Sequence, residues 1–503
     1  MSRVAVAVLG GGISGLSAAY ELHRRGTPFV LLEKSHRLGG MIRTEQVDGF
    51  TVDAGPDSLV TQKPAAIALC EELGLGDRLI PTRAPRTAYV VRGGRLHPLP
   101  PGSVFGIPTG LGQLAAHRLL SWRGRLRLGL ETTAPRDRGA REPGDREPED
   151  REPGGQGLGG RELKSQEPGG REPGGRDAEH RDESIGAFFR RRFGPEATDY
   201  LAEPLLAGIH SGDVERLSIQ ALFPQFVEAE RVHGSVIRAF RRTAAARAGA
   251  AARHGPFRSF ADGLETLPRT LAACLPEHAL RRGNGVAALT AGPPYALETA
   301  DGTRFTADQV ICALPAHAAA PLVAGVDETL GRLCEACTDT SIAIVVLAFP
   351  RSAVAHPLRG SGFVVPRVEP ALSITAATWI SSKWPGRAPD DHVLLRGFLG
   401  GARRPDALAL SDGALVDIVR GDLTRLLGIR GEPALVRLYR WPRANPQHNV
   451  GHLARVAEID RRLARAPGLH IIGAAFRGVG IADCVAAGRA AGRTAAEVAR
   501  SAA

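Results

Sequence analysis

Val-Ala-Val-Ala-Val-Leu-Gly-Gly-Gly-Ile-Ser-Gly, residues 4–15, is the stretch that decides the fold. Its first half is an apolar run of strand length that ends in glycines, as a buried strand does. Residues 15–25 then place apolar side chains at helical spacing, and residues 29–32 form a second short apolar run. Outward from the glycines, the sequence therefore predicts a strand, a helix and a second strand, which is the start of an α/β domain.

The glycines have the G-x-G-x-x-G spacing of a turn that binds the pyrophosphate of a dinucleotide. Gly10 permits the tight turn, Gly12 lets backbone N–H groups approach the phosphates, and Gly15 allows the helix to pack closely on the strand. Glu33, at the end of the second strand, is the acidic residue expected to bind the adenosine ribose. The positive end of the helix adds a favourable potential for the phosphates.

Residues 37–43, which follow the second strand, distinguish between FAD and NAD, the two dinucleotides that use this turn. They read Arg-Leu-Gly-Gly-Met-Ile-Arg and resemble the Arg-x-Gly-Gly extension of the amine-oxidase-like flavoprotein superfamily. Gly39 and Gly40 would let the backbone pass close to the diphosphate and the flavin, and Arg43 would neutralise phosphate charge. A plain glycine turn with solvated arginines is the alternative.

Residues 473–484 supply a second cofactor anchor at the far end of the chain. They read GAAFRGVGIADC, and glycines ahead of a helix leave N–H groups that suit the negative charge of a reduced flavin. This segment resembles the C-terminal flavin segment of the same superfamily. Because it lies more than 400 residues after the first turn, we expect a discontinuous FAD domain.

Further stretches are similar to the protoporphyrinogen oxidase family within that superfamily: residues 52–58, 182–194, 203–213, 217–219 and 478–484. The resemblance covers nearly the whole chain. It implies a fold of class α/β plus α+β, with a discontinuous Rossmann-type FAD-binding domain, a mixed-sheet substrate-binding domain and a helical middle domain. The expected domains are residues 1–82, 257–318 and 441–503 for FAD, 83–100 and 319–440 for the substrate, and 101–256 for the helices.

This resemblance implies the FAD-dependent oxidation of protoporphyrinogen IX to protoporphyrin IX in haem biosynthesis, in which six electrons pass to dioxygen and hydrogen peroxide is released. Coproporphyrinogen III is the alternative substrate. An amine oxidase, a carotenoid desaturase and a non-catalytic flavin- or porphyrin-binding protein are more distant alternatives. Because aromatisation drives the reaction, no dedicated acid or base is expected. The sequence likewise offers no evident Ser-His-Asp, paired-carboxylate or metal constellation.

The resemblance also assigns residues to the site. Arg86, just ahead of a strand predicted at residues 89–91, would hold a propionate carboxylate of the substrate. Val364 and Phe398 would sandwich a pyrrole ring, and the backbone carbonyl of Gly208 would face the pyrrole nitrogens. A surface arginine, two core residues and a plain turn are the alternatives. The expected FAD contacts are Gly10, Gly12, Ile13, Ser14, Gly15, Glu33, Lys34, Arg37, Gly39, Gly40, Met41, Arg43, Gly55, Pro56, Asp57, Ser58, Val286, Trp441, Gly473, Val479, Gly480 and Ile481.

The composition excludes several other classes of protein. The net charge of +11 comes from scattered arginines, no Lys/Arg block is interleaved with aromatics, and nucleic-acid binding is not expected. Cys334 and Cys337 form a C-x-x-C pair without a second pair or a histidine cluster, so we expect no metal site. Six cysteines in so long a chain indicate a reducing, cytoplasmic compartment, and no apolar run is long enough to span a bilayer. Peripheral attachment to the inner face of a membrane and a homodimer stay open.

Residues 136–182 differ from the rest of the chain. They repeat Arg-Glu-Pro-Gly and contain no Val, Ile, Phe, Tyr or Trp, so they are expected to form a disordered insertion in the helical domain. A solvated spacer is the preferred interpretation, and weak association with anionic lipid or a partner is the alternative. Elsewhere the patterns predict a helix over residues 184–193, buried strands over 309–313 and 469–473, and a helix near 483–493.

Overall fold

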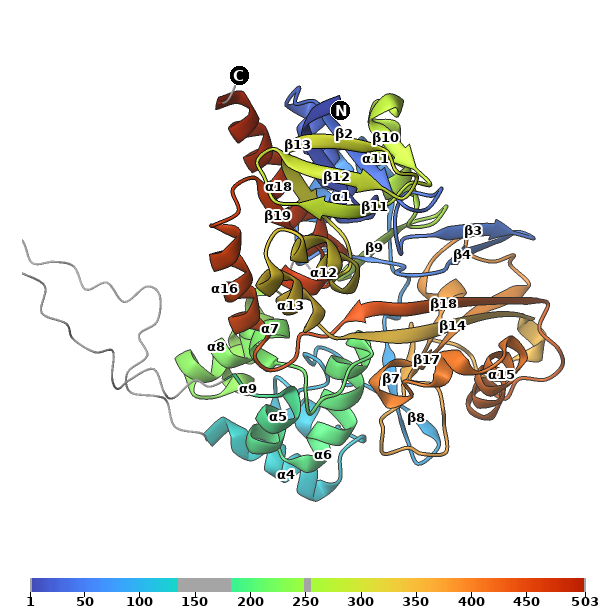
Figure 1. The fold of residues 1–503 in the computed structure, drawn as a ribbon. Coiled ribbons are helices and arrows are strands. Elements are labelled where there is room, and N and C mark those ends of the chain that lie inside the picture. The colour runs from blue at the N-terminus through green and yellow to red at the C-terminus, as the bar shows by residue number, and fades with distance from the viewer. Residues whose placement is uncertain (1, 134–181, 248–254, 502–503) are drawn as a thin grey trace, which may run out of the picture.

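The computed structural model describes residues 2–133, 182–247 and 255–501, so nearly all of the insertion predicted at 136–182 lies outside the described residues. Two seven-stranded sheets and a group of helices make up the described chain (Figure 1). Among the described helices, none combines the length and the apolar character needed to cross a bilayer.

The first sheet confirms the strand, helix, strand unit predicted from the glycine turn. β1 (Ser2–Leu9) pairs in parallel with β2 (Phe29–Glu33) on one side and with β13 (Arg304–Cys312) on the other. The strand predicted at 309–313 is the end of β13, and the strand predicted at 469–473 is β19 (Leu469–Ile471), which pairs with β13. The strand order is β10-β2-β1-β13-β12-β11, where the outer strands are β10 (Leu280–Arg282), β11 (Val286–Thr290) and β12 (Tyr295–Thr299).

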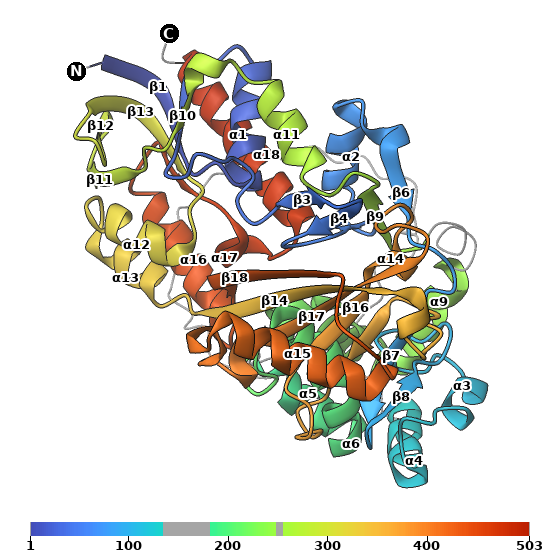
Figure 2. The same ribbon diagram turned by 90° about the vertical axis from the view of Figure 1, so that its right-hand side faces the viewer.

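Helices cover both faces of this sheet. Val6 and Val8 of β1 point into a core shared with α1 (Ile13–Arg24) and α18 (Ile481–Ser501), which lie side by side in Figure 2. Ala7 and Leu9 point the other way, because successive strand residues alternate in direction. Their core includes α12 (Ala316–Ala324), α13 (Glu328–Glu335) and α16 (His452–Leu463).

The packing of α12 and α13 bears on the domain boundary expected at 318/319, which falls inside α12. Cys334 and Cys337 are buried in the core beneath the first sheet, and burial raises the pKa of the Cys334 thiol to about 12. We therefore propose that the first domain extends through Cys337.

The second sheet has the order β18-β14-β17-β16-β15-β7-β8. One face packs on α15 (Asp412–Leu427) through Val419 and Leu423, while the opposite face is turned toward the first domain and the helical group. Trp441 belongs to this sheet, since it pairs with Ile342, so the expected boundary at 440/441 falls inside a strand. The strands are β7 (Ala88–Arg92), β8 (Arg95–Pro98), β14 (Asp339–Pro350), β15 (Gly362–Val364), β16 (Ala376–Trp379), β17 (His392–Gly400) and β18 (Leu435–Pro446).

The helical group includes α5 (Ile185–Phe193), which confirms the helix predicted at 184–193 and begins where the Ser184 hydroxyl accepts a hydrogen bond from the Ala187 N–H. Its core is largely aromatic. The other helices of the group are α3 (Leu111–Ala115), α4 (Trp122–Leu130), α6 (Pro195–Ala197), η4 (Thr198–Ala207), η5 (Gly208–His210), α7 (Ile219–Leu222), α8 (Pro224–His233) and α9 (Val236–Arg247).

Short elements connect these three parts. A hairpin of β3 (Thr44–Val47) and β4 (Phe50–Asp53) lies between the two large sheets in Figure 1. Other short elements of the described chain are β5 (Leu59–Val60), β6 (Leu79–Pro81), β9 (Phe257–Phe260), α2 (Ala65–Glu72), α11 (Thr266–Ala273), α14 (Ile380–Lys383) and α17 (Ala474–Arg477).

Candidate active site

The glycine turn joins β1 to α1 with little room to spare. Gly10 has φ +101°, and a Cβ added there would lie 2.9 Å from the Ala313 carbonyl oxygen. A Cβ on Gly15 would collide with the Gly10 carbonyl oxygen. Gly12 differs, because no atom lies within 4 Å of the place where its Cβ would be, and no side chain caps α1 at this residue. The N-terminus of α1 therefore opens onto free space of the kind that a diphosphate fills.

Glu33 is held against this turn. Its Oε2 accepts a hydrogen bond from the Gly11 N–H (2.7 Å), and its Oε1 accepts one from the Ser35 N–H (2.8 Å). Lys34 lies against the next loop, where a Cβ on Gly285 would be 2.8 Å from the Lys34 Cβ. Val286 follows directly as the first residue of β11. The structure thus places Lys34 and Val286 on neighbouring segments beside Glu33.

The loop 37–43 closes over the turn. Gly39 donates its N–H to the Gly11 carbonyl (2.8 Å), and both Gly39 and Gly40 have positive φ, which favours glycine. The Arg37 guanidinium donates to the carbonyls of Leu38, Gly40 and Ile42, so this arginine shapes the loop itself.

Arg43 and Met41 complete this loop. The Arg43 guanidinium lies over the Tyr439 ring, 5.8 Å from its centroid. Met41 approaches the segment 55–58 so closely that a Cβ on Gly55 would collide with the Met41 carbonyl oxygen.

Asp57 is the centre of a buried charged cluster between the segment 53–58 and the second sheet. Its carboxylate accepts hydrogen bonds from Lys383 Nζ (2.9 Å) and Trp384 Nε1 (3.2 Å) and lies 3.3 Å from Arg396 Nη2. Burial opposes ionisation, but Lys383 and Arg396 outweigh it and hold the pKa of Asp57 well below its usual range. Since the Asp57 side chain is committed to these partners and also accepts from Ser58 Oγ, its backbone is the part left for a cofactor.

The same sheet holds the backbone of the segment. Arg396 donates to the carbonyls of Asp53 (3.1 Å) and Gly55 (2.9 Å), the second of which directly precedes Pro56. Trp441 Nε1 donates to the Ala54 carbonyl (2.7 Å). Asp53 in turn lies 2.9 Å from Arg387, and burial raises the pKa of Asp53 despite that partner. These contacts fix the segment predicted to run beside the flavin.

The C-terminal anchor meets the first turn from the other side. A Cβ on Gly488 of α18 would collide with the Ser14 carbonyl, and one on Gly492 would lie 2.7 Å from the Ala18 carbonyl. This register shows that α1 and α18 run in the same direction, so their N-termini converge. The residues that lead into α18 are Gly473 (φ +126°), Gly478 (φ +139°), Val479, Gly480 and Ile481.

Val364 and Phe398 share one face of the second sheet. Val364 is registered with Ala376, and Ala376 with Phe398, so their side chains point to the same side. Val364 packs against the helical core, while Phe398 packs against the core that contains the β3–β4 hairpin and lies 4.9 Å from the Arg396 guanidinium. The structure therefore places these two residues on the same face of the sheet with β16 between them, and their contact with a pyrrole ring stays a prediction.

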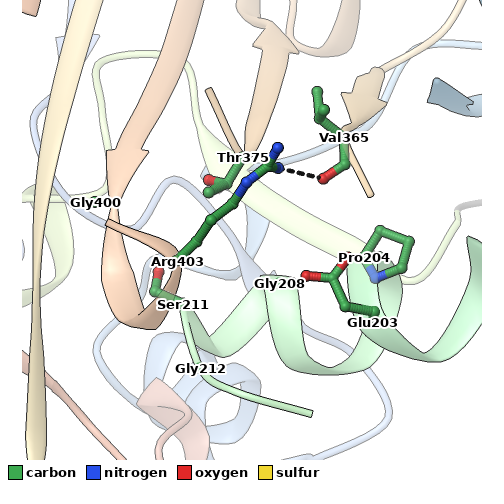
Figure 3. A pocket seen from close by; sticks show the side chains of 9 residues that line it. All are labelled: Glu203, Pro204, Gly208, Ser211, Gly212, Val365, Thr375, Gly400 and Arg403. Atoms are coloured by element: carbon green, nitrogen blue, oxygen red, sulfur yellow. Dashed lines mark hydrogen bonds between the residues drawn. The ribbon is translucent and has the colours of Figure 1, made fainter. Parts of the chain in front are cut away.

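Gly208 borders a small cavity at the end of the same sheet (Figure 3). Val365, which follows Val364, and Gly400, two residues after Phe398, also line it. The Gly208 carbonyl accepts a hydrogen bond from the Ser211 N–H (3.0 Å), which uses one of its two lone pairs. The turn at Gly208 is thus adjacent to the face that carries the predicted pyrrole contacts.

Arg86 lies apart from this cavity. It is exposed, its Nε donates to Thr82 Oγ1 (3.0 Å), and it precedes β7 by two residues. Val90 of β7 is registered with Val364 in a parallel pair, and Arg86 precedes Val90 by four residues. The cavity with Gly208 lies in the other direction, beyond Val364, because Val365 lines it. A contact of Arg86 with a substrate carboxylate stays a prediction.

Sequence reasoning missed the residues that pair with Asp53 and Asp57. Lys383, Trp384 and Arg387 stand in one short stretch, and Arg396 interrupts the apolar strand at 393–399. A charged residue inside such a run is a signal of a buried partner, although the sequence does not say which. Glu203 is likewise an acidic residue inside a largely apolar helix, η4.

Comparisons with known proteins agree with this geometry. A family model described as flavin containing amine oxidoreductase matches residues 13–496. Coproporphyrinogen III oxidase of Bacillus subtilis (strain 168) is 35% identical over 497 residues, which cover 97% of this chain and 96% of that protein. Protoporphyrinogen oxidase 2, chloroplastic/mitochondrial, of Arabidopsis thaliana is 26% identical over 510 residues (96% and 92%). A solved structure of a protein from Exiguobacterium sp. 255-15 has a TM-score of 0.79 and 31% identity over 99% of each chain.

The residues present fit the flavin that this family name implies. Two helix N-termini converge beside the open space at Gly12, and Glu33 is held at the turn where a ribose would lie. None of the described residues has to move for the diphosphate to lie in this space. The chain therefore belongs to the flavin containing amine oxidoreductase family and is an FAD-dependent oxidoreductase.

Proposed function

We propose that this enzyme oxidises a porphyrinogen to the corresponding porphyrin in haem biosynthesis, with dioxygen as the final electron acceptor. The observation that carries the proposal is the 35% identity, over nearly the full length of both chains, with a protein named coproporphyrinogen III oxidase. Val364 and Phe398 lie on one face of the second sheet, whose Arg396 and Trp441 hold the segment predicted to run beside FAD, and apolar side chains in that place suit a tetrapyrrole.

Coproporphyrinogen III is the substrate that we propose, because the more similar relative carries that name. Protoporphyrinogen IX, the substrate first expected, stays as the second candidate, since the Arabidopsis relative at 26% identity is named protoporphyrinogen oxidase. The two substrates differ in the number of carboxylates at the ring edge. Arg86 is the cation that we assign to one of them.

FAD, when bound, supplies the acceptor for hydride and passes the electrons to dioxygen. The chain itself positions the substrate: Val364 and Phe398 would hold a pyrrole ring against the sheet and exclude water from it. The buried cluster around Asp57 would keep the cofactor segment and this sheet in fixed register.

The test is anaerobic mixing of the purified yellow protein with each porphyrinogen. We expect the flavin absorbance near its visible maximum to bleach and then to return when air is admitted, with porphyrin formed in proportion. A higher rate with coproporphyrinogen III supports the proposed substrate, and a higher rate with protoporphyrinogen IX reverses that choice. Binding of porphyrin without bleaching would contradict an enzymatic role.

We also propose that α4 attaches the protein to the surface of an anionic membrane. Trp122, Leu126 and Leu130 recur at four-residue spacing and are 65%, 59% and 52% exposed. Arg123 is exposed beside them, and α4 contains no acidic residue, which suits anionic headgroups. Sedimentation with phosphatidylglycerol vesicles tests this: Trp122→Ala should reduce binding severalfold, and equal binding to neutral vesicles would contradict it.

A further inference from the structure

Glu203 stands out among the residues of the cavity beside Gly208. Nine residues line this cavity, and Glu203 is the only carboxylate among them (Figure 3). It precedes Gly208 by five residues on the π-helical element η4, and the Gly208 N–H donates to the Glu203 carbonyl. Side chain and turn are therefore fixed relative to each other.

One oxygen of this carboxylate is already engaged and the other is open. Oε2 accepts a hydrogen bond from the Arg367 N–H (2.8 Å). Within the described part of the chain Oε1 receives no hydrogen bond, and its nearest cation is Arg367 Nε at 4.0 Å. The side chain is only 12% exposed. Oε1 is therefore largely shielded by protein yet free to bind a donor from outside the described chain.

The surrounding charges set the protonation of Glu203. Burial raises its pKa, the Arg367 N–H and the guanidinium groups of Arg403 and Arg367 oppose that rise, and Asp199 adds to it. Arg403 spends its own donors on the carbonyls of Val365, Glu369 and Leu372, so it acts on Glu203 as a nearby charge. A proton acceptor works best when its pKa lies nearer the working pH than that of an exposed glutamate.

The cavity also has a suitable size. Its volume of about 10 Å³ is close to the space that one water molecule needs, and Glu203, Ser211 and Arg403 are polar residues in its lining. Val365 and Gly400, which also line it, follow the predicted pyrrole contacts Val364 and Phe398 by one and two residues. A water held in this cavity would link Glu203 to a pyrrole N–H at the predicted Gly208 position.

From this geometry we infer that Glu203 accepts the proton that the substrate loses in each oxidation cycle; the inference rests on the proposed function. Over three cycles three meso carbons lose hydride, two of the three protons come from pyrrole nitrogens, and the third comes from the remaining meso carbon after its hydrogen has moved to a nitrogen by tautomerisation. In one cycle a meso C–H bond breaks with its electron pair, for which FAD, when bound, would be the acceptor. The N–H bond breaks as the hydride leaves, and its electrons prevent a positive charge from building up on the ring, so the flavin bleaches only as fast as the proton departs. The proton passes through the water to Glu203, which releases it to solvent before the next cycle.

Glu203→Gln tests the assignment because glutamine keeps the shape and the Arg367 contact but accepts no proton. In anaerobic stopped flow we expect the rate of flavin bleaching by porphyrinogen to fall about 100-fold or more. The wild-type rate should decline as the pH falls through the raised pKa of Glu203, whereas the Glu203→Gln rate should be low and flat. Affinity for the porphyrin product, followed by fluorescence quenching, should stay within about twofold.

Asp199→Asn is the matched control, because Asp199 is a half-buried carboxylate one turn earlier on the same element and does not line the cavity. It should leave the rate at neutral pH unchanged, and because Asp199 adds to the raised pKa of Glu203, it should move the acidic limb of the pH profile only to lower pH. Glu203→Asp should keep the acidic limb of the profile. If Glu203→Gln loses flavin or melts early, Glu203→Ala is used with added formate, which should restore bleaching by refilling the cavity.

Two outcomes would overturn the inference. One is a Glu203→Gln enzyme that bleaches at the wild-type rate with the wild-type pH profile. The other is a slow Glu203→Ala enzyme that formate does not rescue. A wild-type protein that no porphyrinogen bleaches would instead contradict the proposed function, so the two failures are distinguishable.

Discussion

Replacing Asp57 by asparagine probes the buried cluster that joins the cofactor segment to the second sheet. The substitution preserves shape and leaves Lys383 and Arg396, 11% and 5% exposed, facing a neutral amide. Lys383 can escape by losing its proton. With an ordinary pKa of 10.5, deprotonation at pH 7 costs roughly 5 kcal/mol, at 1.36 kcal/mol per pKa unit. This cost is the upper limit for the destabilisation by an unpaired Lys383, and it agrees with the roughly 3–5 kcal/mol typical of breaking a buried pair.

The assay is urea unfolding of the flavin-loaded protein, followed by tryptophan fluorescence and by release of flavin. Asp57→Asn should lower the free energy of the first cooperative transition by about 3–5 kcal/mol. Glu298→Gln is the control, because its ion pair with Arg304 is exposed and should contribute no more than about 1 kcal/mol. A loss of under about 1 kcal/mol for Asp57→Asn would refute the role assigned to the cluster.

The pH dependence follows from the lowered pKa of Asp57. A carboxyl whose pKa is lowered by folding stabilises the protein fully above its unfolded pKa, and this stabilisation is lost as the pH falls toward the folded value. The part of the wild-type stability that comes from Asp57 should therefore be lost as the pH falls below 3.8, and the difference between the wild type and Asp57→Asn should narrow there. A difference that widens below pH 3.8 would have the wrong sign.

Three further predictions concern the cofactor, the substrate and the insertion. Gly12→Val should give colourless protein, because its side chain would fill the open space at the N-terminus of α1; retention of stoichiometric FAD, measured by absorbance, would mean that the turn is misassigned. Arg86→Ala should weaken substrate binding by about 1.5–3 kcal/mol with flavin content unchanged, and unaltered steady-state kinetics would make Arg86 a surface residue. Replacing residues 137–181 with a short Gly-Ser linker should leave flavin content, oxidation rate and melting temperature nearly unchanged, since loop length costs only about 0.6 kcal/mol per doubling; a large loss of any of the three would contradict the spacer interpretation.

The first domain was predictable because its signals are local. The glycine turn at residues 10–15, the apolar strands on either side and the acidic residue that ends β2 all lie within one short stretch. Such motifs combine backbone conformation and packing needs that few other sequences meet. The predicted and observed helix limits differ by only a few residues: α1 begins at Ile13, whereas the predicted helix begins at residue 15.

The charged cluster and the cavity could not be predicted because they join distant parts of the chain. Asp57 and Lys383 are 326 positions apart, and nothing in the sequence pairs them. The hydrogen bonds from Arg37 to the loop carbonyls could not be predicted because they depend on backbone geometry, and its contact with the cofactor stays a prediction. Glu203 was overlooked for a related reason: an isolated acidic residue resembles any other until the fold shows what surrounds it.

The parallel packing of α1 and α18 has a consequence for how the protein is made. Arg489 of α18 pairs with Glu21 of α1 across 468 positions of sequence. At roughly 5–20 residues per second, a ribosome needs about 25–90 s to synthesise the interval. During that time the nascent α1 presents to solvent the apolar flank that α18 will later cover. The first domain, and with it the part of the predicted flavin site that α18 supplies, is therefore completed only after α18 has been synthesised.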